Sequence, residues 1–331
     1  MSERTNKVAI IGAGAVGATI AYACIIRGVA KQIALYDVNR QKVDAEVLDL
    51  NHGLQFVPAA TIEGSDDPAV CAGADVVVVT AGAKQKPGQT RMDLAAANAA
   101  MVRQMVPRLV DLCPDGHFLL VTNPVDVITY LTLRVSGLPD RRVLGSGTVL
   151  DSSRFRYLIA QRCRVAVQNV HAIIAGEHGD SEVPLWSSAA VGTVPLSQWA
   201  VPGHGNLTVR DRTEIFQNVK DAAAQIIAGK GATNYAVGLA TARIVEALLK
   251  DENAVLPVSS LLTDYRPLAH AGAAKADGGG EAVSDVCLSV PCIVNRAGVE
   301  ARLAVPMNDA EAAGLRNSAD RIREAVRAVG F

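Results

Sequence analysis

A glycine-rich turn near the N-terminus and an acidic residue beyond it have the types and spacing of a dinucleotide-binding site. Gly12, Gly14 and Gly17 form a GxGxxG pattern that follows an apolar, strand-like run and opens a helix-like one. Asp37 ends the next strand-like run, twenty residues after Gly17. Glycines alone often serve only a tight turn. Strand, turn, helix, strand and acid in one unit are the fingerprint of dinucleotide binding.

Each of these residues has a separate physical task in such a site. Gly12 permits the tight turn, Gly14 lets the backbone approach a pyrophosphate, and Gly17 allows the helix to pack closely on the strand. The helix N-terminus offers unpaired N–H groups and a partial positive charge to the phosphates. Asp37 would accept hydrogen bonds from the adenosine ribose and would repel a 2′-phosphate. The sequence therefore predicts NAD, rather than NADP, as the cofactor.

Four further segments place polar residues in otherwise apolar surroundings. Residues 122–126 (TNPVD) stand at the C-terminal end of an apolar run, where open α/β sheets bind ligands. Residues 84–91 (KQKPGQTR) follow the apolar run at 76–79, and residues 151–156 (DSSRFR) open a helical pattern. Residues 176–180 (GEHGD) end a strand-like run and contain a histidine, whose imidazole titrates close to working pH.

The elements that must position these segments change in character half-way along the chain. In the first 150 residues, near-continuous apolar runs alternate with helical patterns, as in parallel strands covered on both faces. This alternation predicts an α/β fold with a Rossmann-type doubly wound parallel sheet, residues 1–146 forming the NAD-binding domain. Residues 147–331 are predicted to form a mixed α+β substrate and catalytic domain, whose helix near 232–249 packs back on the first domain. The predicted strands of the first half are 8–11, 33–36, 76–79 and 118–121, and the predicted helices are 15–27, 151–163, 210–228, 232–249 and 308–329.

Composition and charge restrict the class of protein. Half of the 331 residues are hydrophobic and a fifth are charged, which predicts a packed globular core and excludes disorder. The formal net charge is −1 without a large basic cluster, so nucleic acid is not an expected partner.

The cysteines and the N-terminal run bear on metal binding and location. None of the six cysteines has CxxC or zinc-ligand spacing, which predicts no metal site and a reduced, cytoplasmic protein. Residues 8–26 carry no charge, but the early glycines predict a buried strand, turn and helix rather than a signal peptide or membrane span.

The motifs GAGAVG, KPGQTRMDL, TNPVD, DSSRFR and GEHGDSE together resemble those of the L-lactate dehydrogenases, of bacterial type, in the lactate/malate dehydrogenase family. The similarity runs from about residue 7 to residue 329. It implies an NAD-dependent oxidoreductase that interconverts pyruvate and L-lactate by hydride transfer at the nicotinamide. His178 would be the general acid/base, and Asp151 would hold its tautomer and stabilise its protonated form.

The resemblance also implies binding roles. Arg154, three residues from Asp151 on one helix face, would clamp the substrate carboxylate with two parallel hydrogen bonds. Arg91 would be brought down by a closing loop to polarise the carbonyl, and Asn123 would donate to the substrate oxygen near the nicotinamide. Taken singly, each charged residue could be an ordinary solvated charge. The implied cofactor residues are Gly12, Gly14, Val16, Gly17, Asp37, Lys42, Gly82, Ala83, Val121, Asn123 and Ser146.

Two positions bear on the choice of substrate. Malate-type relatives place an arginine where this chain has Gln85, and threonine at the position of Thr233 goes with the lactate type. Neutral Gln85 would leave a second substrate carboxylate unpaired, which costs several kcal/mol. A malate or other 2-hydroxy-acid dehydrogenase, or a non-catalytic NAD-binding protein, are the alternatives. Retention of Arg91, Asp151, Arg154 and His178 together speaks against the non-catalytic one.

A second cationic pair lies away from the predicted chemistry. Arg156 projects about 200° round the helix from Arg154, and His171 begins the run that ends at His178. Both match positions by which bacterial lactate dehydrogenases bind fructose 1,6-bisphosphate across a subunit interface. The resemblance therefore implies an allosteric homotetramer. The plainer alternative is that Arg156 pairs with an acidic residue on a surface helix.

Overall fold

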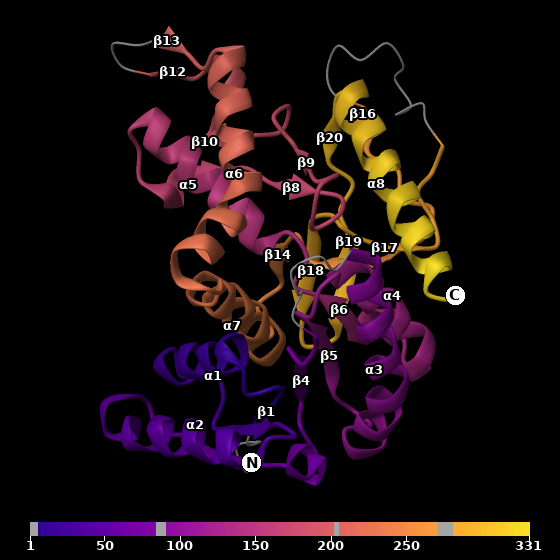
Figure 1. Ribbon diagram of the computed structural model, residues 1–331. Helices are drawn as coiled ribbons and strands as arrows, with labels where there is room; N and C mark the ends of the chain where they lie inside the picture. Colours follow the sequence, from indigo (N-terminus) through magenta and orange to yellow (C-terminus); the bar gives the residue numbers. More distant parts are fainter. Residues whose placement is uncertain (1–5, 84–90, 202–204, 270–280) are drawn as a thin grey trace.

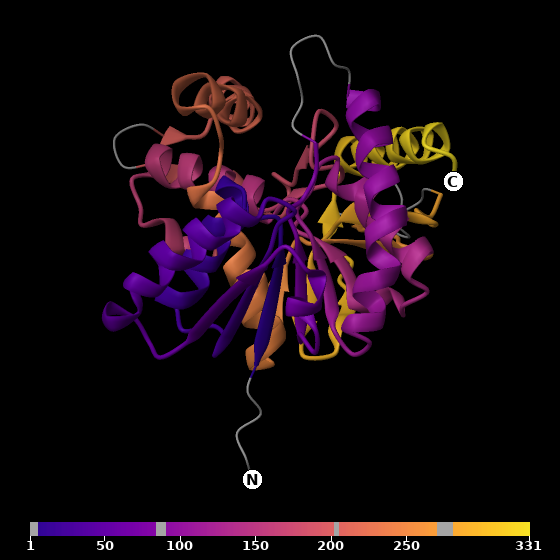
Figure 2. The same ribbon diagram turned by 60° about the horizontal axis from the view of Figure 1, so that its bottom comes forward.

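The structure is a computed structural model that describes residues 6–83, 91–201, 205–269 and 281–331, with the backbone alone for residues 91–93. Its centre is an eight-stranded sheet in the order β3-β2-β1-β4-β5-β6-β15-β17 (Figures 1 and 2). The first six strands of this order are parallel, and β15 and β17 are antiparallel to β6 and β15, respectively. The order reverses direction at β1 and β4, which is the doubly wound Rossmann arrangement and confirms the predicted fold class. The strands are β1 (Lys7–Ile11), β2 (Gln32–Tyr36), β3 (Thr61–Ser65), β4 (Val76–Val79), β5 (His117–Leu120), β6 (Val143–Gly145), β15 (Ser259–Leu262) and β17 (Val286–Ser289).

Apolar, β-branched sequence explains the central strands. The four valines of β4 are completely buried, because the sheet is covered on both faces and no position faces water. The four strands predicted in this half are confirmed. Two strands of this half lie outside the predicted ones, because β3 is a polar edge strand (TIEGS) and β6 has only three residues.

Helices cover both faces of the sheet. Figure 2 shows α1 (Ala15–Ile26) and α2 (Arg40–His52) on one side, and α3 (Arg91–Leu112) and α4 (Val125–Ser136) on the other. The uncharged run at residues 8–26 folds into β1, the glycine turn and α1, as predicted. No helix in the described part of the chain is long and apolar enough to cross a membrane.

The second half of the chain contributes to the layers of the first. It supplies β15 and β17 to the central sheet, and its helix α7 (Tyr235–Lys250) packs against α1. A Cβ added at Gly238 would lie 2.6 Å from the Thr19 methyl carbon, so only glycine lets the two helices approach this closely. Arg27, which directly follows α1, pairs with the buried Glu246 of α7.

Two of the remaining helices, α5 (Val149–Cys163) and α6 (Val209–Lys230), pack around a second, smaller apolar core, and α8 (Asp309–Ala328) is the last helix. Phe155 and Ile159 of α5 are completely buried in this core, together with Val219 of α6. At the start of α8, Asn308 and Glu311 form a capping box.

Residues 170–175 form two short strands, β7 and β8, rather than one. These strands pair with different neighbours, β10 and β9 respectively. The short strands are β7 (Val170–His171), β8 (Ile174–Ala175), β9 (Val183–Pro184), β10 (Ala190–Val191), β11 (Val194–Pro195), β12 (Ala200–Val201), β13 (Gly205–Asn206), β14 (Ala254–Leu256), β16 (Leu268–Ala269), β18 (Cys292–Asn295), β19 (Gly298–Arg302) and β20 (Pro306–Met307).

Candidate active site

The predicted cofactor residues follow the carboxyl ends of neighbouring parallel strands. Gly12 follows β1, Gly82 and Ala83 follow β4, Asn123 follows β5 with Val121 before it, and Ser146 follows β6. Since these strands are adjacent and parallel, their carboxyl ends lie along one edge of the sheet. That edge, at the point where the strand order reverses, is where open α/β sheets bind ligands.

At two of the three glycines of the turn, Gly12 and Gly17, a side chain would collide with the backbone. Gly12 has φ +102°, and a Cβ there would lie 2.8 Å from the backbone nitrogen of Ala81. A Cβ at Gly17 would lie 1.9 Å from the carbonyl oxygen of Gly12, so α1 starts in direct contact with the turn. No side chain of the described chain caps the N-terminus of α1 at Gly14, so no side chain competes with a phosphate for its first N–H groups.

Asp37 and Lys42 border this turn. The Asp37 carboxylate accepts hydrogen bonds from the backbone N–H groups of Ala13 (2.8 Å) and Asn39 (3.0 Å), which fix its orientation. The Lys42 Nζ lies 3.9 Å from Asp37 Oδ2 and 3.8 Å from a Cβ built at Gly14. An acid placed for ribose hydroxyls and a cation over the phosphate turn together fit an adenine dinucleotide.

Asn98 of α3 is a site residue outside those predicted from the sequence. This residue is 1% exposed, and its amide bridges two segments of the cofactor edge. Its Oδ1 accepts from the Ala83 N–H at 2.8 Å, and its Nδ2 donates to the Asn123 carbonyl at 2.7 Å. A lone polar residue within the apolar run at 94–100 (LAAANAA) would have been the available signal.

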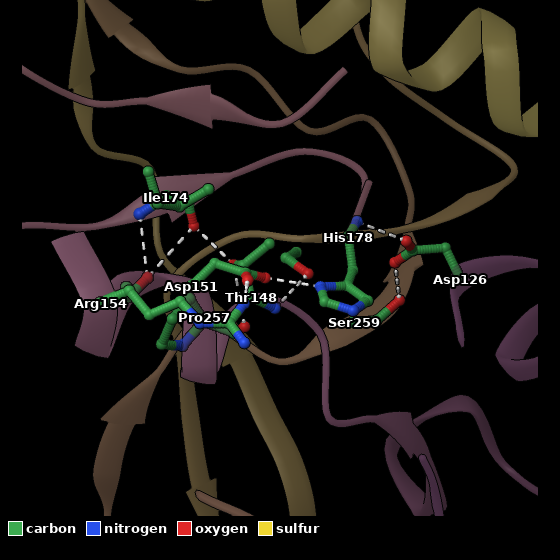
Figure 3. Close-up of polar contacts among 10 residues, drawn as sticks. Asp126, Thr148, Asp151, Arg154, Ile174, His178, Pro257 and Ser259 are labelled. Atoms are coloured by element: carbon green, nitrogen blue, oxygen red, sulfur yellow. Dashed lines mark hydrogen bonds and ion pairs between the residues drawn. The ribbon is translucent and has the colours of Figure 1, made fainter. Parts of the chain in front are cut away.

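Asp151 and His178 meet at the junction of α5 and the loop after β8. His178 Nδ1 lies 2.5 Å from Asp151 Oδ2, and Arg154 Nη1 donates to Asp151 Oδ1 at 2.9 Å (Figure 3). Thr148 Oγ1 donates to the Ile174 carbonyl at 2.5 Å and so joins the start of α5 to β8. The i+3 spacing thus places Arg154 beside the acid–base pair.

A second buried carboxylate holds the backbone of His178. Asp126 of α4 is 1% exposed and accepts from the His178 N–H at 2.8 Å and from Ser259 Oγ at 2.6 Å (Figure 3). Burial raises the pKa of this carboxyl to about 6, although both hydrogen bonds oppose the rise. The TNPVD motif marks Asp126 as a polar residue in apolar surroundings, but the sequence does not indicate this role.

The charges around the imidazole favour its protonated form. Asp151 is the largest cause that raises the pKa of His178 to about 9, against the effect of burial. Burial alone would raise the pKa of Asp151, but His178 and Arg154 outweigh it and lower this pKa. Burial, and then the charge of Asp151, raise the pKa of Glu182 to about 8. At neutral pH the site therefore holds an imidazolium against an ionised Asp151.

The other predicted residues are placed as follows. Arg156 points away from Arg154 and donates from Nε to the Ala172 carbonyl at 2.7 Å, next to the exposed His171. Thr233 is half-buried just before α7. The backbone of Arg91 opens α3, but its side chain and all of Gln85 lie outside the described residues. No group of three or more His, Cys, Asp or Glu in the described part of the chain is arranged to hold a metal ion.

Comparison with known proteins accounts for both halves of the chain. Residues 6–145 match the NAD-binding domain of the lactate/malate dehydrogenases, and residues 148–329 match the α/β C-terminal domain of the same proteins. The chain belongs to the lactate/malate dehydrogenase family. Within this family, its N-terminal domain supports NAD as the cofactor, as the glycine turn and Asp37 predict.

Similar members of the family are bacterial. An L-lactate dehydrogenase of Bifidobacterium animalis subsp. lactis is 51% identical over 99% of this chain and 98% of its own length. One of Acetivibrio thermocellus is 45% identical over 97% and 96%. The crystal structure of the minor L-lactate dehydrogenase of Enterococcus mundtii, in a ligand-bound form, is 40% identical and superposes with a TM-score of 0.90 over 99% of both chains.

Proposed function

We propose that this protein is an NAD-dependent L-lactate dehydrogenase that interconverts pyruvate and L-lactate. The observation that carries the proposal is the Asp151–His178 contact, with Arg154 on the same carboxylate, in a chain that has the NAD-binding domain of its family. The similar L-lactate dehydrogenases support the choice of substrate. We assign residues 1–146 to cofactor binding and residues 147–331 to substrate binding and catalysis.

NADH, when bound, supplies the hydride to the carbonyl carbon of the substrate. Gly12, Gly14, Gly17, Asp37 and Lys42 would hold its phosphates and ribose. The remaining groups along the carboxyl edge, which would line the nicotinamide half, are Val16, Gly82, Ala83, Val121, Asn123 and Ser146.

His178 supplies the proton that pyruvate reduction requires. Nδ1 is engaged by Asp151, so the proton on Nε2 is the one available for the substrate oxygen. A pKa of about 9 keeps the imidazole protonated at neutral pH, which suits proton donation to the developing alkoxide. In lactate oxidation the same nitrogen takes the proton back.

Arg154 is placed to bind the substrate carboxylate. One of its five N–H donors is used by Asp151, and the remaining donors suffice for a two-bond clamp on a carboxylate. Its side chain is 15% exposed, so a substrate carboxylate would meet a partly desolvated charge. Arg91, Gln85, Asn123 and Thr233 complete the proposed substrate site.

Parallel assays with pyruvate, oxaloacetate and 2-oxoisocaproate test the assignment. The loss of NADH absorbance should be fastest with pyruvate, and His178→Asn should cost at least about 10²-fold in turnover while NADH still binds. Near-native turnover of this variant would refute the role of His178. A preference for oxaloacetate would make the protein a malate dehydrogenase, and inactivity on all three would favour a non-catalytic NAD-binding protein.

We further propose a cytoplasmic homotetramer that binds fructose 1,6-bisphosphate through Arg156 and His171. All six cysteines are free and buried, which suits a reducing compartment. Among the described residues, the hydrogen bond of Arg156 goes to a carbonyl rather than to an acid, and burial lowers the pKa of its guanidinium. A phosphate would supply the missing countercharge. The test is pyruvate saturation with and without the bisphosphate, for the parent and for the Arg156→Gln/His171→Gln double variant. If the sugar changes neither the apparent KM for pyruvate nor the oligomeric state of either protein, the proposed bisphosphate site is wrong.

A further inference from the structure

The loop that carries His178 is closed by its own side chains. The Glu177 carboxylate accepts hydrogen bonds from the Ser181 N–H, at 3.2 Å, and from the Ser181 hydroxyl. Before the loop, Gly176 exchanges two backbone hydrogen bonds with Ser289 of β17, at 2.8 and 3.0 Å. His178 thus lies in a tight turn between two residues that are bonded to each other.

One hydroxyl of α8 bonds to both sides of this turn. The Ser318 hydroxyl donates to the Ser181 carbonyl and accepts from the Glu177 N–H at 3.3 Å. The side chain is completely buried, and a Cβ at Gly176 would lie only 2.6 Å from its Oγ. The hydroxyl gives its only proton to the Ser181 carbonyl and accepts from the Glu177 N–H, and the close packing leaves it little room to move. These contacts fix the position of the turn relative to α8.

We propose that Ser318 is a positioning residue for catalysis, which sets the place of the His178 imidazole relative to Asp151. The inference rests on the proposed role of His178 as the acid/base. In the described part of the chain, side chains from three different helices hold His178 and its turn in place. Asp151 of α5 holds the ring, Asp126 of α4 holds the backbone N–H, and Ser318 of α8 holds the two sides of the turn.

Loss of the Ser318 hydroxyl should act on the imidazole through the turn. Alanine at this position leaves the Glu177 N–H and the Ser181 carbonyl without a buried partner, so the turn must shift to reach another one. A shift of the imidazole away from Asp151 weakens the largest cause that keeps its pKa high, and the pKa of His178 should fall. The charged groups around the imidazole are Asp151 with Arg154 on α5, Asp126 on α4, and Glu177 and Glu182 on its own loop.

The experiment compares Ser318→Ala with Ser187→Ala in the full-length protein. Ser187 is a matched control because its hydroxyl also bonds to α8, at Glu311, but outside the turn that holds His178. In Ser318→Ala we expect kcat/KM for pyruvate to fall about 10- to 100-fold, with NADH affinity unchanged within about twofold. As the pH rises, the rate of this variant should also begin to fall at a lower pH than the rate of the parent. Ser187→Ala should keep both properties of the parent.

A readout without substrate separates this inference from the proposed function. The His178 side chain is 27% exposed, so diethyl pyrocarbonate can acylate its neutral form, and peptide mass spectrometry follows the rate against pH. In Ser318→Ala the modification should begin at lower pH than in the parent. If Ser318→Ala does not fold, Ser318→Cys, which is slightly larger and keeps only a weak donor, is measured instead, with a change in the same direction expected.

Two results would overturn the inference. One is a modification profile and a kcat/KM for pyruvate in Ser318→Ala that are identical to those of the parent, and the other is an equal change in Ser187→Ala. If the parent itself fails to reduce pyruvate, the proposed function is wrong, whereas the modification profile still decides whether Ser318 positions the imidazole.

Discussion

Replacing Asp151 with asparagine tests the electrostatic basis of the proposed mechanism. The carboxylate lies 2.5 Å from His178 Nδ1 and is the largest cause that raises the pKa of the imidazole from 6.5 to about 9. This elevation corresponds to about 3 kcal/mol of preferential stabilisation of the protonated form. Asparagine has nearly the same size but carries no charge, so the pKa should return towards its ordinary value.

The size of the effect follows from the protonated fraction. At about pH 7.5 an imidazole with a pKa of about 9 is almost fully protonated, whereas one with a pKa near 6.5 is only about one-tenth protonated. Protonation alone therefore costs Asp151→Asn about tenfold in kcat/KM for pyruvate. The lost orientation of the ring adds to this, for a total of about 10² to 10⁴. Lowering the pH to about 5.5 should recover only the tenfold part.

The assay is the initial rate of NADH oxidation against pH for the parent, Asp151→Asn and the control Asp44→Asn. Asp44 is an exposed acid on α2 that pairs with Arg40, so its loss should leave the profile unchanged. The parent rate should fall as the pH rises through about 9, and that of Asp151→Asn near 6.5. An Asp151→Asn profile that still declines near pH 9 would refute the reasoning, because another group would then set the pKa.

The same shift links stability to pH, and two further substitutions test the cofactor edge. The folded protein holds the His178 proton up to about pH 9, so this residue stabilises the fold most below pH ~6.5 and loses that contribution by pH ~9. Chemical denaturation should therefore show a smaller loss of unfolding free energy over this pH range in Asp151→Asn than in the parent. Gly17→Ala would place a Cβ 1.9 Å from the Gly12 carbonyl oxygen, so NADH affinity by fluorescence should fall at least about tenfold, and unchanged affinity would mean that the turn can move. Asn98→Asp keeps the acceptor for the Ala83 N–H but sets a carboxylate against the Asn123 carbonyl, and it should raise KM for both NADH and pyruvate about tenfold; a change in only one constant would show that Asn98 does not brace both segments.

The sequence by itself determined the local elements of the cofactor site. The glycine pattern, the apolar strand before it and Asp37 after it lie within 40 residues, and each depends on backbone sterics or on covalent spacing. These constraints act on neighbouring residues, so no long-range contact is needed to recognise them. The same holds for the i+3 placement of Asp151 and Arg154, which one helical turn fixes.

Only the tertiary structure decided which distant polar groups meet. Asp126 and Ser259 are 133 residues apart, and Ser181 and Ser318 are 137 apart, yet each pair is joined by a buried hydrogen bond. Asp126 shows in the sequence only as a polar residue in an apolar helix, and Ser318 only as one of many polar residues in α8. The partner of each is set by the packing of the layers, and the elevated pKa of His178 depends on that packing because desolvation and close charges exist only in the folded protein.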